Sequence, residues 1–442
     1  MQLMKFTLTK GCNISKYFFL LLFFVMSSCS DHETRPFTGN KVDIFKKNKL
    51  SISKNSDVSL NKVLTNRYWA QKGGDRNHSI SNFSFKFPLK KTFSKNTNQE
   101  RSDYFPNLAN PVVDEKNIYI FNTEGKISSI NKSDFKLNWE NVVFQDEPSF
   151  PNPGSIVVQV NKNDLYLHNG SNVIISVDKK NGKIIWKYEN TFPFKGNITL
   201  NDKYLLVNDY DNNLLAFRDK KLVWKKKLGQ SDKSIFTSIR PIVFDNKVIN
   251  PAYNGLFHIL SLDDGKLIYS DYLESNRNKT SILLDNDIVA NPIIHENKLY
   301  ILSHSGTLAA YDLNDLKPVW ADQIGGINTP IVSGNSLFII DNEGMLYAID
   351  NANGHIIWEK QFATNIEEGF YFKDNKKVSF TGPFLLQNKL LLFSNKGTLH
   401  IINPNDGKID KILKFDSLGS DPVFFENKLI ILTYDGYLKI YK

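Results

Sequence analysis

The sequence predicts an all-β fold: an eight-bladed β-propeller of four-stranded antiparallel blades, closed by an N-terminal strand that completes the last blade. Three observations support this prediction. A turn pattern recurs eight times, a proline and an aromatic residue keep a nearly fixed distance from that turn, and the last repeat is one strand short. Repeats of about 44 residues that cannot bury both faces alone are typical of blades stacked in a ring.

The N-terminus precedes this pattern and predicts a signal peptide over residues 1–28. Three lysines come before ten consecutive apolar residues, 17–26, and two serines and Cys29 follow. This order marks a secretory signal, and ten apolar residues are too few to span a membrane as a helix. Cys29 after two small residues resembles the lipobox of bacterial lipoproteins. The resemblance implies that Cys29 is acylated, with palmitate among its acyl chains; the alternative is ordinary cleavage near Ser28 without lipidation.

Residues 29–63 are rich in Lys, Asn and Ser and predict a lipidated flexible tether. The formal charge of the whole chain is +9, and without residues 1–28, which hold three lysines and no acid, it is +6. The lysines are scattered and form no basic stripe, so a nucleic-acid partner is not expected. The apolar fraction of 41% excludes a mostly disordered chain.

The eight repeats define one propeller domain over residues 64–442, including an N-terminal leader segment. A proline that can open an innermost strand precedes the turn by 14 residues in six repeats. An aromatic residue follows it by 14 residues in five repeats and by 12 in a sixth. The turn residues are Gly or Asn, which tolerate positive φ. They are Gly125, Asn172, Asn212, Gly255, Gly306, Gly344, Gly397 and Gly436; the prolines are Pro111, Pro241, Pro292, Pro330, Pro383 and Pro422; the aromatics are Trp139, Trp186, Trp224, Tyr269, Trp320 and Trp358.

The last repeat turns at Gly436, and the chain ends at Lys442 before a fourth strand can form. An open edge would result unless another segment supplies that strand. Phe93 lies 18 residues before Pro111, a distance within the range that separates the aromatic from the next proline in the other repeats. We therefore expect residues 89–94 to complete the eighth blade.

The run Leu-Tyr, Gly-x-Leu-x-Ala-x-Asp and Gly-x-x-x-Trp resembles the pyrroloquinoline-quinone-like propeller repeat. Eight such repeats behind a lipobox resemble the BamB family of outer-membrane assembly lipoproteins, over about residues 64–442. Residues 69–78 are similar to a leader segment of some members. The resemblance implies a non-catalytic scaffold, lipid-anchored at the periplasmic face of the outer membrane. It also implies that the scaffold docks the periplasmic domains of a BamA-type insertase, with unfolded outer-membrane proteins as further candidate partners.

The resemblance also implies a partner-binding site. Ile239 and Arg240, before Pro241, resemble a family docking motif, and Asp287, before Pro292, matches an acidic position of the next blade. A second family aspartate is Val289 here. In an antiparallel blade, the connections that carry Arg240 and Asp287 lie on one ring face, and their lengths vary most along the chain. Variable loops on a rigid scaffold are where recognition usually resides.

Two other functions stay open at this stage: a periplasmic binding or sensor propeller, and a pyrroloquinoline-quinone-dependent dehydrogenase. Those dehydrogenases carry a vicinal disulfide and a calcium site, whereas the only cysteines here are Cys12 and Cys29. His168, His258, His304 and His400 belong to different repeats and do not form a metal-site pattern. The sequence therefore predicts no catalytic residue, no cofactor and no metal.

Overall fold

The computed structural model describes residues 57–74, 82–97, 109–122, 125–144, 154–159, 162–229, 239–273, 287–304, 306–362 and 378–442. The chain divides into two units, Met1–Lys46 and Lys47–Lys442, and all described residues belong to the second. The predicted signal peptide, Cys29 and the predicted tether up to residue 56 lie outside the described residues. None of the helices within the described ranges is long and apolar enough to cross a membrane.

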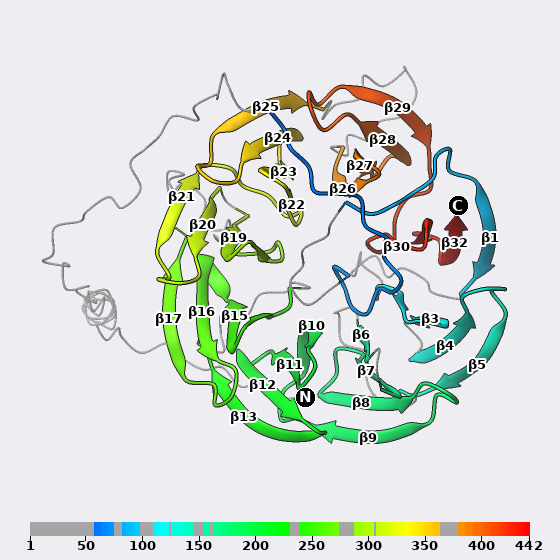
Figure 1. Cartoon of the computed structure of the whole chain (residues 1–442). Coiled ribbons are helices and arrows are strands. Elements are labelled where there is room, and N and C mark those ends of the chain that lie inside the picture. The colour runs from blue at the N-terminus through cyan, green and yellow to red at the C-terminus, as the bar shows by residue number, and fades with distance from the viewer. Residues whose placement is uncertain are drawn as a thin grey trace, which may run out of the picture. The chain divides into compact units, whose positions relative to one another are not determined.

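Eight four-stranded antiparallel sheets follow one another around a ring (Figure 1). Blades one to four are β2 (Val112–Val113), β3 (Asn117–Phe121), β4 (Lys126–Asn131), β5 (Leu137–Val142); β6 (Ser155–Val158), β7 (Asp164–His168), β8 (Val173–Asp178), β9 (Ile184–Glu189); β10 (Phe194–Leu200), β11 (Tyr204–Asp209), β12 (Asn213–Arg218), β13 (Lys221–Lys227); and β14 (Ile242–Phe244), β15 (Lys247–Pro251), β16 (Leu256–Ser261), β17 (Leu267–Tyr272). A short 3-10 helix, η1 (Tyr253–Gly255), joins β15 to β16.

Blades five to eight continue the same order from the innermost strand outward. They are β18 (Ile293–His295), β19 (Lys298–Leu302), β20 (Leu308–Asp312), β21 (Pro318–Asp322); β22 (Ile331–Ser333), β23 (Ser336–Ile340), β24 (Met345–Asp350), β25 (Ile356–Gln361); β26 (Phe380–Leu386), β27 (Lys389–Ser394), β28 (Thr398–Ile402), β29 (Ile409–Lys414); and β30 (Val423–Phe425), β31 (Lys428–Leu432), β32 (Tyr437–Tyr441), β1 (Lys91–Asn96). The eight-bladed architecture predicted from the repeats is confirmed.

Strand position in the blade determines burial. The second strands, such as β7 and β31, are buried along almost their whole length because both of their faces pack against neighbouring blades. The outermost strands, such as β5 and β9, alternate exposed and half-buried residues because one of their faces meets water. The core therefore lies between the blades, as expected for units that cannot bury both faces alone.

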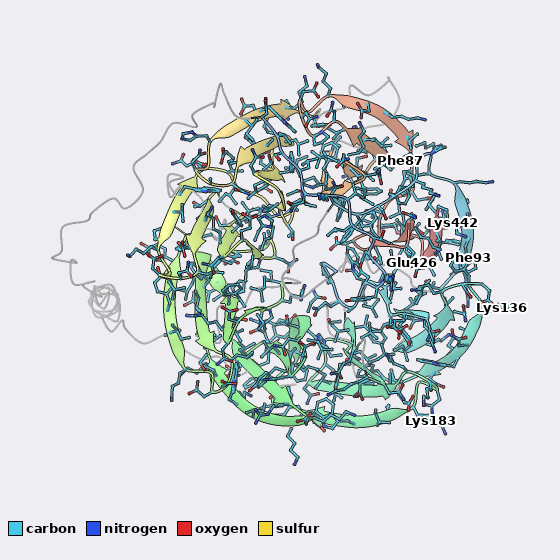
Figure 2. All side chains as sticks on the ribbon, in the orientation of Figure 1. Phe87, Phe93, Lys136, Lys183, Glu426 and Lys442 are labelled. Carbon is cyan, nitrogen blue, oxygen red and sulfur yellow. The ribbon has the colours of Figure 1, made fainter. Side chains whose placement is uncertain are left out.

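The ring closes through β1, as predicted. β1 pairs antiparallel with β32, and Phe93 lies opposite Ile440. The main chains of Lys90 and Lys442 exchange two hydrogen bonds of 2.8 and 2.9 Å next to this pair. Figure 2 places Phe93 and Lys442 on the same part of the ring. The strand begins two residues later than expected, at Lys91.

The turn and proline positions follow the prediction with two differences. Seven of the eight predicted turn residues have positive φ, but Asn172 does not, and Gly170 takes the left-handed conformation in that turn with φ 83°. The prediction for Asn172 was wrong because a glycine two residues earlier adopts this conformation without steric cost. Five prolines stand directly before an innermost strand, whereas Pro383 lies inside β26, where the register shifts and no regular ladder bond is needed.

The leader runs across the turns between the first and second strands of several blades. The backbone N–H of Asn61 donates to Ser333 Oγ in blade six, and the Asn66 amide donates to the Phe424 carbonyl in blade eight. Residues 57–63, the end of the predicted tether, contact the ring in the same region. The boundary at residue 64 stays a prediction.

Trp69 and Gln71 extend these contacts to blades one and three. Trp69 exchanges two backbone hydrogen bonds with Val113, and Gln71 Oε1 accepts a hydrogen bond from the Leu200 backbone N–H. The Trp69 ring is 1% exposed and packs edge-on against Phe424. The leader thus links blades that lie far apart in the chain.

Candidate partner-docking site

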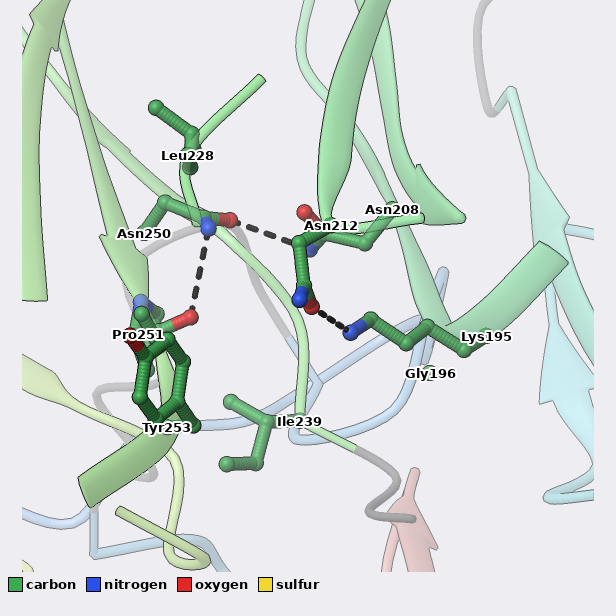
Figure 3. Close-up of a pocket in the computed structure, with 10 residues that line it drawn as sticks. Lys195, Gly196, Asn208, Asn212, Leu228, Ile239, Asn250, Pro251 and Tyr253 are labelled. Carbon is green, nitrogen blue, oxygen red and sulfur yellow. Dashed lines mark hydrogen bonds between the residues drawn. The ribbon is translucent and has the colours of Figure 1, made fainter. Parts of the chain in front are cut away.

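A depression lies between blades three and four (Figure 3). The residues that line it stand at the strand ends of the ring face predicted for recognition. It is bounded by the turn between β11 and β12, the connection from β13 to β14, and η1 with the residues before it. It holds about 470 Å³ of free space, part of it open solvent. The residues that line it are Lys195, Gly196, Asn208, Asn212, Leu228, Ile239, Asn250, Pro251, Ala252 and Tyr253.

The polar wall of the depression is built mainly from asparagine side chains. The Asn208 amide donates to Asn250 Oδ1 at 3.0 Å, and the Asn250 amide donates to the neighbouring carbonyl of Pro251 at 3.2 Å. Lys195 Nζ donates to Asn212 Oδ1 at 2.5 Å (Figure 3). An asparagine amide carries both a donor and an acceptor, the two kinds of group that pair with a peptide backbone.

Lys195 carries a charge that burial makes costly. Burial lowers the pKa of Lys195 to about 8, and the carboxylates of Asp209 and Asp287 oppose this shift. Since Asp287 acts on Lys195, the structure brings this predicted residue close to the depression. The ammonium is therefore partly neutralised by acids on the chain itself.

The three predicted docking residues lie in one corner of the ring but differ in exposure. Ile239 is 8% exposed and lines the depression, while Arg240 is completely buried. The Arg240 backbone N–H donates to Asn291 Oδ1 at 3.4 Å, which ties its loop to the connection that carries Asp287. Asp287 is half-buried, and its carbonyl accepts a hydrogen bond from the His304 backbone N–H.

Two buried histidines support the walls of the depression from behind. His168 Nδ1 accepts a hydrogen bond from the Gly170 backbone N–H, so its Nε2 carries the proton and donates to the Gly196 carbonyl. His258 Nε2 contacts the Leu228 carbonyl at 3.0 Å. Burial lowers the pKa of both histidines, that of His168 to about 4. They are neutral at ordinary pH and act as structural links between blades.

The sequence did not single out Lys195, Asn250 or Tyr253. Lys195 stands in a strand with no motif around it, and its role depends on burial, which appears only in the structure. Tyr253 lies over Gly229, where a Cβ would come within 3.0 Å of the tyrosine ring. The sequence signal that could have indicated this contact is the Gly229 position itself, at the end of a fourth strand.

The comparisons with known proteins point to one family. The family model described as "Outer membrane protein assembly factor BamB" matches residues 145–360. Curated proteins of that name are similar to this chain: that of Moranella endobia is 23% identical over 77% of this chain and 86% of its own length. That of Yersinia pestis is 21% identical over 79% and 88%. The chain is BamB-like.

Solved structures agree on the fold of this BamB-like chain. BamB from Moraxella catarrhalis superposes with a TM-score of 0.64 at 14% identity, over 80% of this chain and 100% of that one. A europium-containing methanol dehydrogenase superposes with a TM-score of 0.66 at 11% identity, over 82% and 89%. At these identities the likeness establishes a shared propeller fold, so it does not separate a scaffold from an enzyme.

Proposed function

We propose that this chain is a non-catalytic scaffold of the outer-membrane β-barrel assembly machinery, and that it docks the periplasmic domains of a BamA-type insertase. The observation that carries the proposal is the range of the family match. Residues 145–360 run from blade two to blade six, and they contain the depression between blades three and four together with Ile239, Arg240 and Asp287. The part of the chain that matches the family model therefore contains the candidate docking site.

Docking would use the rim of the depression, while Arg240 holds that rim from inside. Tyr253 is half-exposed and offers an aromatic face with a hydroxyl, a type of residue that is enriched at interface hot spots. The asparagine amides offer hydrogen bonds to a partner's backbone. Ile239, beneath them, gives the site an apolar base. A small apolar centre within a polar rim is the usual anatomy of a non-obligate interface.

The anchor belongs to the same proposal. Residues 1–28 would direct export, Cys29 would carry the acyl chains, and the segment after it would tether the propeller to the periplasmic face of the outer membrane. Several acyl chains hold a protein on a bilayer without a spanning helix, since each buried methylene contributes about 0.8 kcal/mol. Anchoring would keep the docking face near a membrane-embedded partner and raise its effective concentration.

An affinity purification tests the proposal. The tagged full-length chain is purified from detergent-solubilised envelopes of one culture. A variant with Asp287→Lys and Tyr253→Ala, carrying the same tag, is purified in the same way from a second culture. Arg240 is left unchanged, because an acid at that fully buried position would disturb the fold. The insertase is expected to co-purify with the wild type and to be depleted with the variant. Recovery of the insertase in neither sample, with a quinone-dependent dehydrogenase or a sensor kinase instead, would contradict the scaffold.

The variant needs a control on the opposite ring face. Lys266, in the turn between β16 and β17 of the same blade, is largely exposed, with 83% of its side chain accessible. Lys266→Glu reverses a charge without touching the docking corner. It is expected to leave insertase recovery unchanged, so a loss there would place docking elsewhere.

A further inference from the structure

Four tryptophans of the fourth strands have the same partner in the next blade. Each indole N–H donates to a backbone carbonyl in the turn between the third and fourth strands, three residues before a glycine. The pairs are Trp139 with Lys179 (2.9 Å), Trp224 with Leu262 (2.9 Å), Trp320 with Asn351 (3.1 Å) and Trp358 with Pro404 (2.8 Å). The turn therefore completes the environment of each indole.

The glycine of each turn lies against the tryptophan ring. These glycines have φ between 67° and 79°, and a Cβ on any of them would come within 2.4–2.8 Å of a ring atom. They are Gly182, Gly265, Gly354 and Gly407. Only glycine combines this backbone conformation with such a close approach.

Trp186 in β9 lacks this arrangement. The turn that should cover it is reduced to two residues, Asp219 and Lys220, with φ of 49° and 64°, and it contains no glycine. Within the described part of the chain, no residue accepts a hydrogen bond from the Trp186 indole N–H. Its Nε1 is not one of the buried atoms that lack a partner, so this N–H is accessible to solvent. The ring contacts Tyr166 and Phe217 edge-on, on the side of the blades.

A second depression marks the place of the missing turn. It holds about 360 Å³ of free space, and Tyr166, Trp186 and Phe217 form its aromatic wall. Lys162 and Lys203, both exposed, and the half-buried Lys220 also line it. This aromatic slot between blades two and three lies on the leader side of the ring, opposite the candidate docking site.

The charges around the aromatic slot favour an acidic occupant. Lys220 Nζ lies 2.7 Å from an Asp164 oxygen and bridges the two blades. Among the described residues that line the slot, Asp219 is the one acid against three lysines, and Asp164 compensates Lys220, so positive charge remains in slight excess. A carboxylate entering here meets net positive charge.

We propose that the aromatic slot docks a glycine-containing acidic turn of a partner protein. The chain's own turns define the chemistry: a carbonyl accepts from the Trp186 indole, and a glycine three residues later lies on its ring. An Asp or Asn before that glycine, as at Asn181, Asp264, Asn353 and Asp406, faces the lysines. Because the slot and the insertase-docking site occupy opposite faces, both partners can bind at once, and this inference does not depend on the proposed function.

Indole NMR of the full-length chain, titrated with a cyclic peptide of sequence Asn-Pro-Asn-Asp-Gly-Ser, tests the proposal. This sequence is the turn at residues 403–408 with serine in place of Lys408, which leaves the peptide acidic. The Trp186 N–H signal is expected to shift, while the four tryptophans that already have carbonyl partners keep their positions. Trp186→Phe should weaken binding about three- to tenfold, the range for one hydrogen bond. A peptide with valine in place of glycine should not bind measurably.

A graft provides the matched control. Replacing Asp219 and Lys220 by the five residues 262–266 of blade four supplies the missing turn within the chain. The grafted protein should show the Trp186 signal at its shifted position and should no longer bind the peptide. An unmoved Trp186 signal at saturating peptide, or equal peptide binding by the grafted protein, would overturn the proposal. A Trp186 shift that depends on protein concentration alone would also overturn it, in favour of a second copy of this chain as occupant.

Discussion

Phe93 of β1 and Ile440 of β32 lie opposite each other in one antiparallel pair, although they stand near the two ends of the propeller sequence. Phe93 also packs against Phe135 of blade one, with ring centroids 5.1 Å apart. Phe93 therefore connects β1, the strand that closes the ring, with the first blade. The seam is held without a covalent bond and depends on this packing.

Replacing Phe93 should open the seam. Phe93→Asp is expected to lower the free energy of unfolding by about 2–3 kcal/mol, because it removes half-buried aromatic surface and brings a charge against Phe135. Ser94→Asp, on the exposed face of the same strand, should change it by less than about 0.5 kcal/mol. Denaturant unfolding of the two variants measures the difference. Equal stability of the variants would show that β1 does not hold the ring closed.

The leader should contribute to stability through Trp69. Trp69→Ala is expected to lower the free energy of unfolding by about 3–5 kcal/mol, the range for a buried aromatic side chain. The neighbouring Tyr68 is 45% exposed, so Tyr68→Ala serves as the control and should have a small effect. The same denaturant titration reports both. If Trp69→Ala unfolds like the wild type, the leader is not part of the cooperative unit.

His168 should make the propeller sensitive to mild acid. Its pKa is about 4 in the folded chain because of burial, against about 6.5 in an unfolded chain. The unfolded state binds the proton first, so stability is full above about pH 6.5 and falls as the pH drops towards 4, by about 3 kcal/mol in all. His168→Gln should flatten the wild-type slope in this window. An unchanged slope would mean that His168 is not buried in its neutral form.

Substitutions at Arg240 and Asp287 should differ in their effect on stability, although both should weaken docking. Arg240→Ala is expected to lower the free energy of unfolding by about 2–4 kcal/mol, because it removes a large side chain at a completely buried position. Asp287→Asn keeps its shape and should cost less than about 1 kcal/mol. Both should weaken insertase binding, measured on purified proteins. If Arg240→Ala is as stable as the wild type, the buried Arg240 side chain does not hold the loop.

The ring was predictable because its determinants are local and repeated. Gly436 and Pro422 sit in the same phase as their counterparts in the other blades, and the missing final strand indicated Phe93. The path of the leader was not predictable, because Gln71 reaches Leu200 through one side chain and one backbone N–H. The shortened turn before Trp224 did leave a trace in the sequence: this aromatic follows its turn by 12 residues instead of 14.

The docking role of the three candidate residues stays a prediction, and the sequence did not indicate how they are buried. The resemblance led to Ile239, Arg240 and Asp287, and the structure brings them to one corner. It did not indicate that Arg240 is buried or that Lys195 and Tyr253 line the surface. Burial depends on how blades three, four and five pack, and no pattern within a single repeat encodes it.

Photo-crosslinking in living cells tests the docking face most directly. A photoreactive amino acid is placed at Tyr253, beside the depression, or at Lys266 on the opposite face of the same blade. Tyr253 should crosslink to the periplasmic domains of the insertase, and Lys266 should not. Crosslinks to the insertase from Lys266 alone, or from neither position while the protein is folded and anchored, would contradict the proposed docking face.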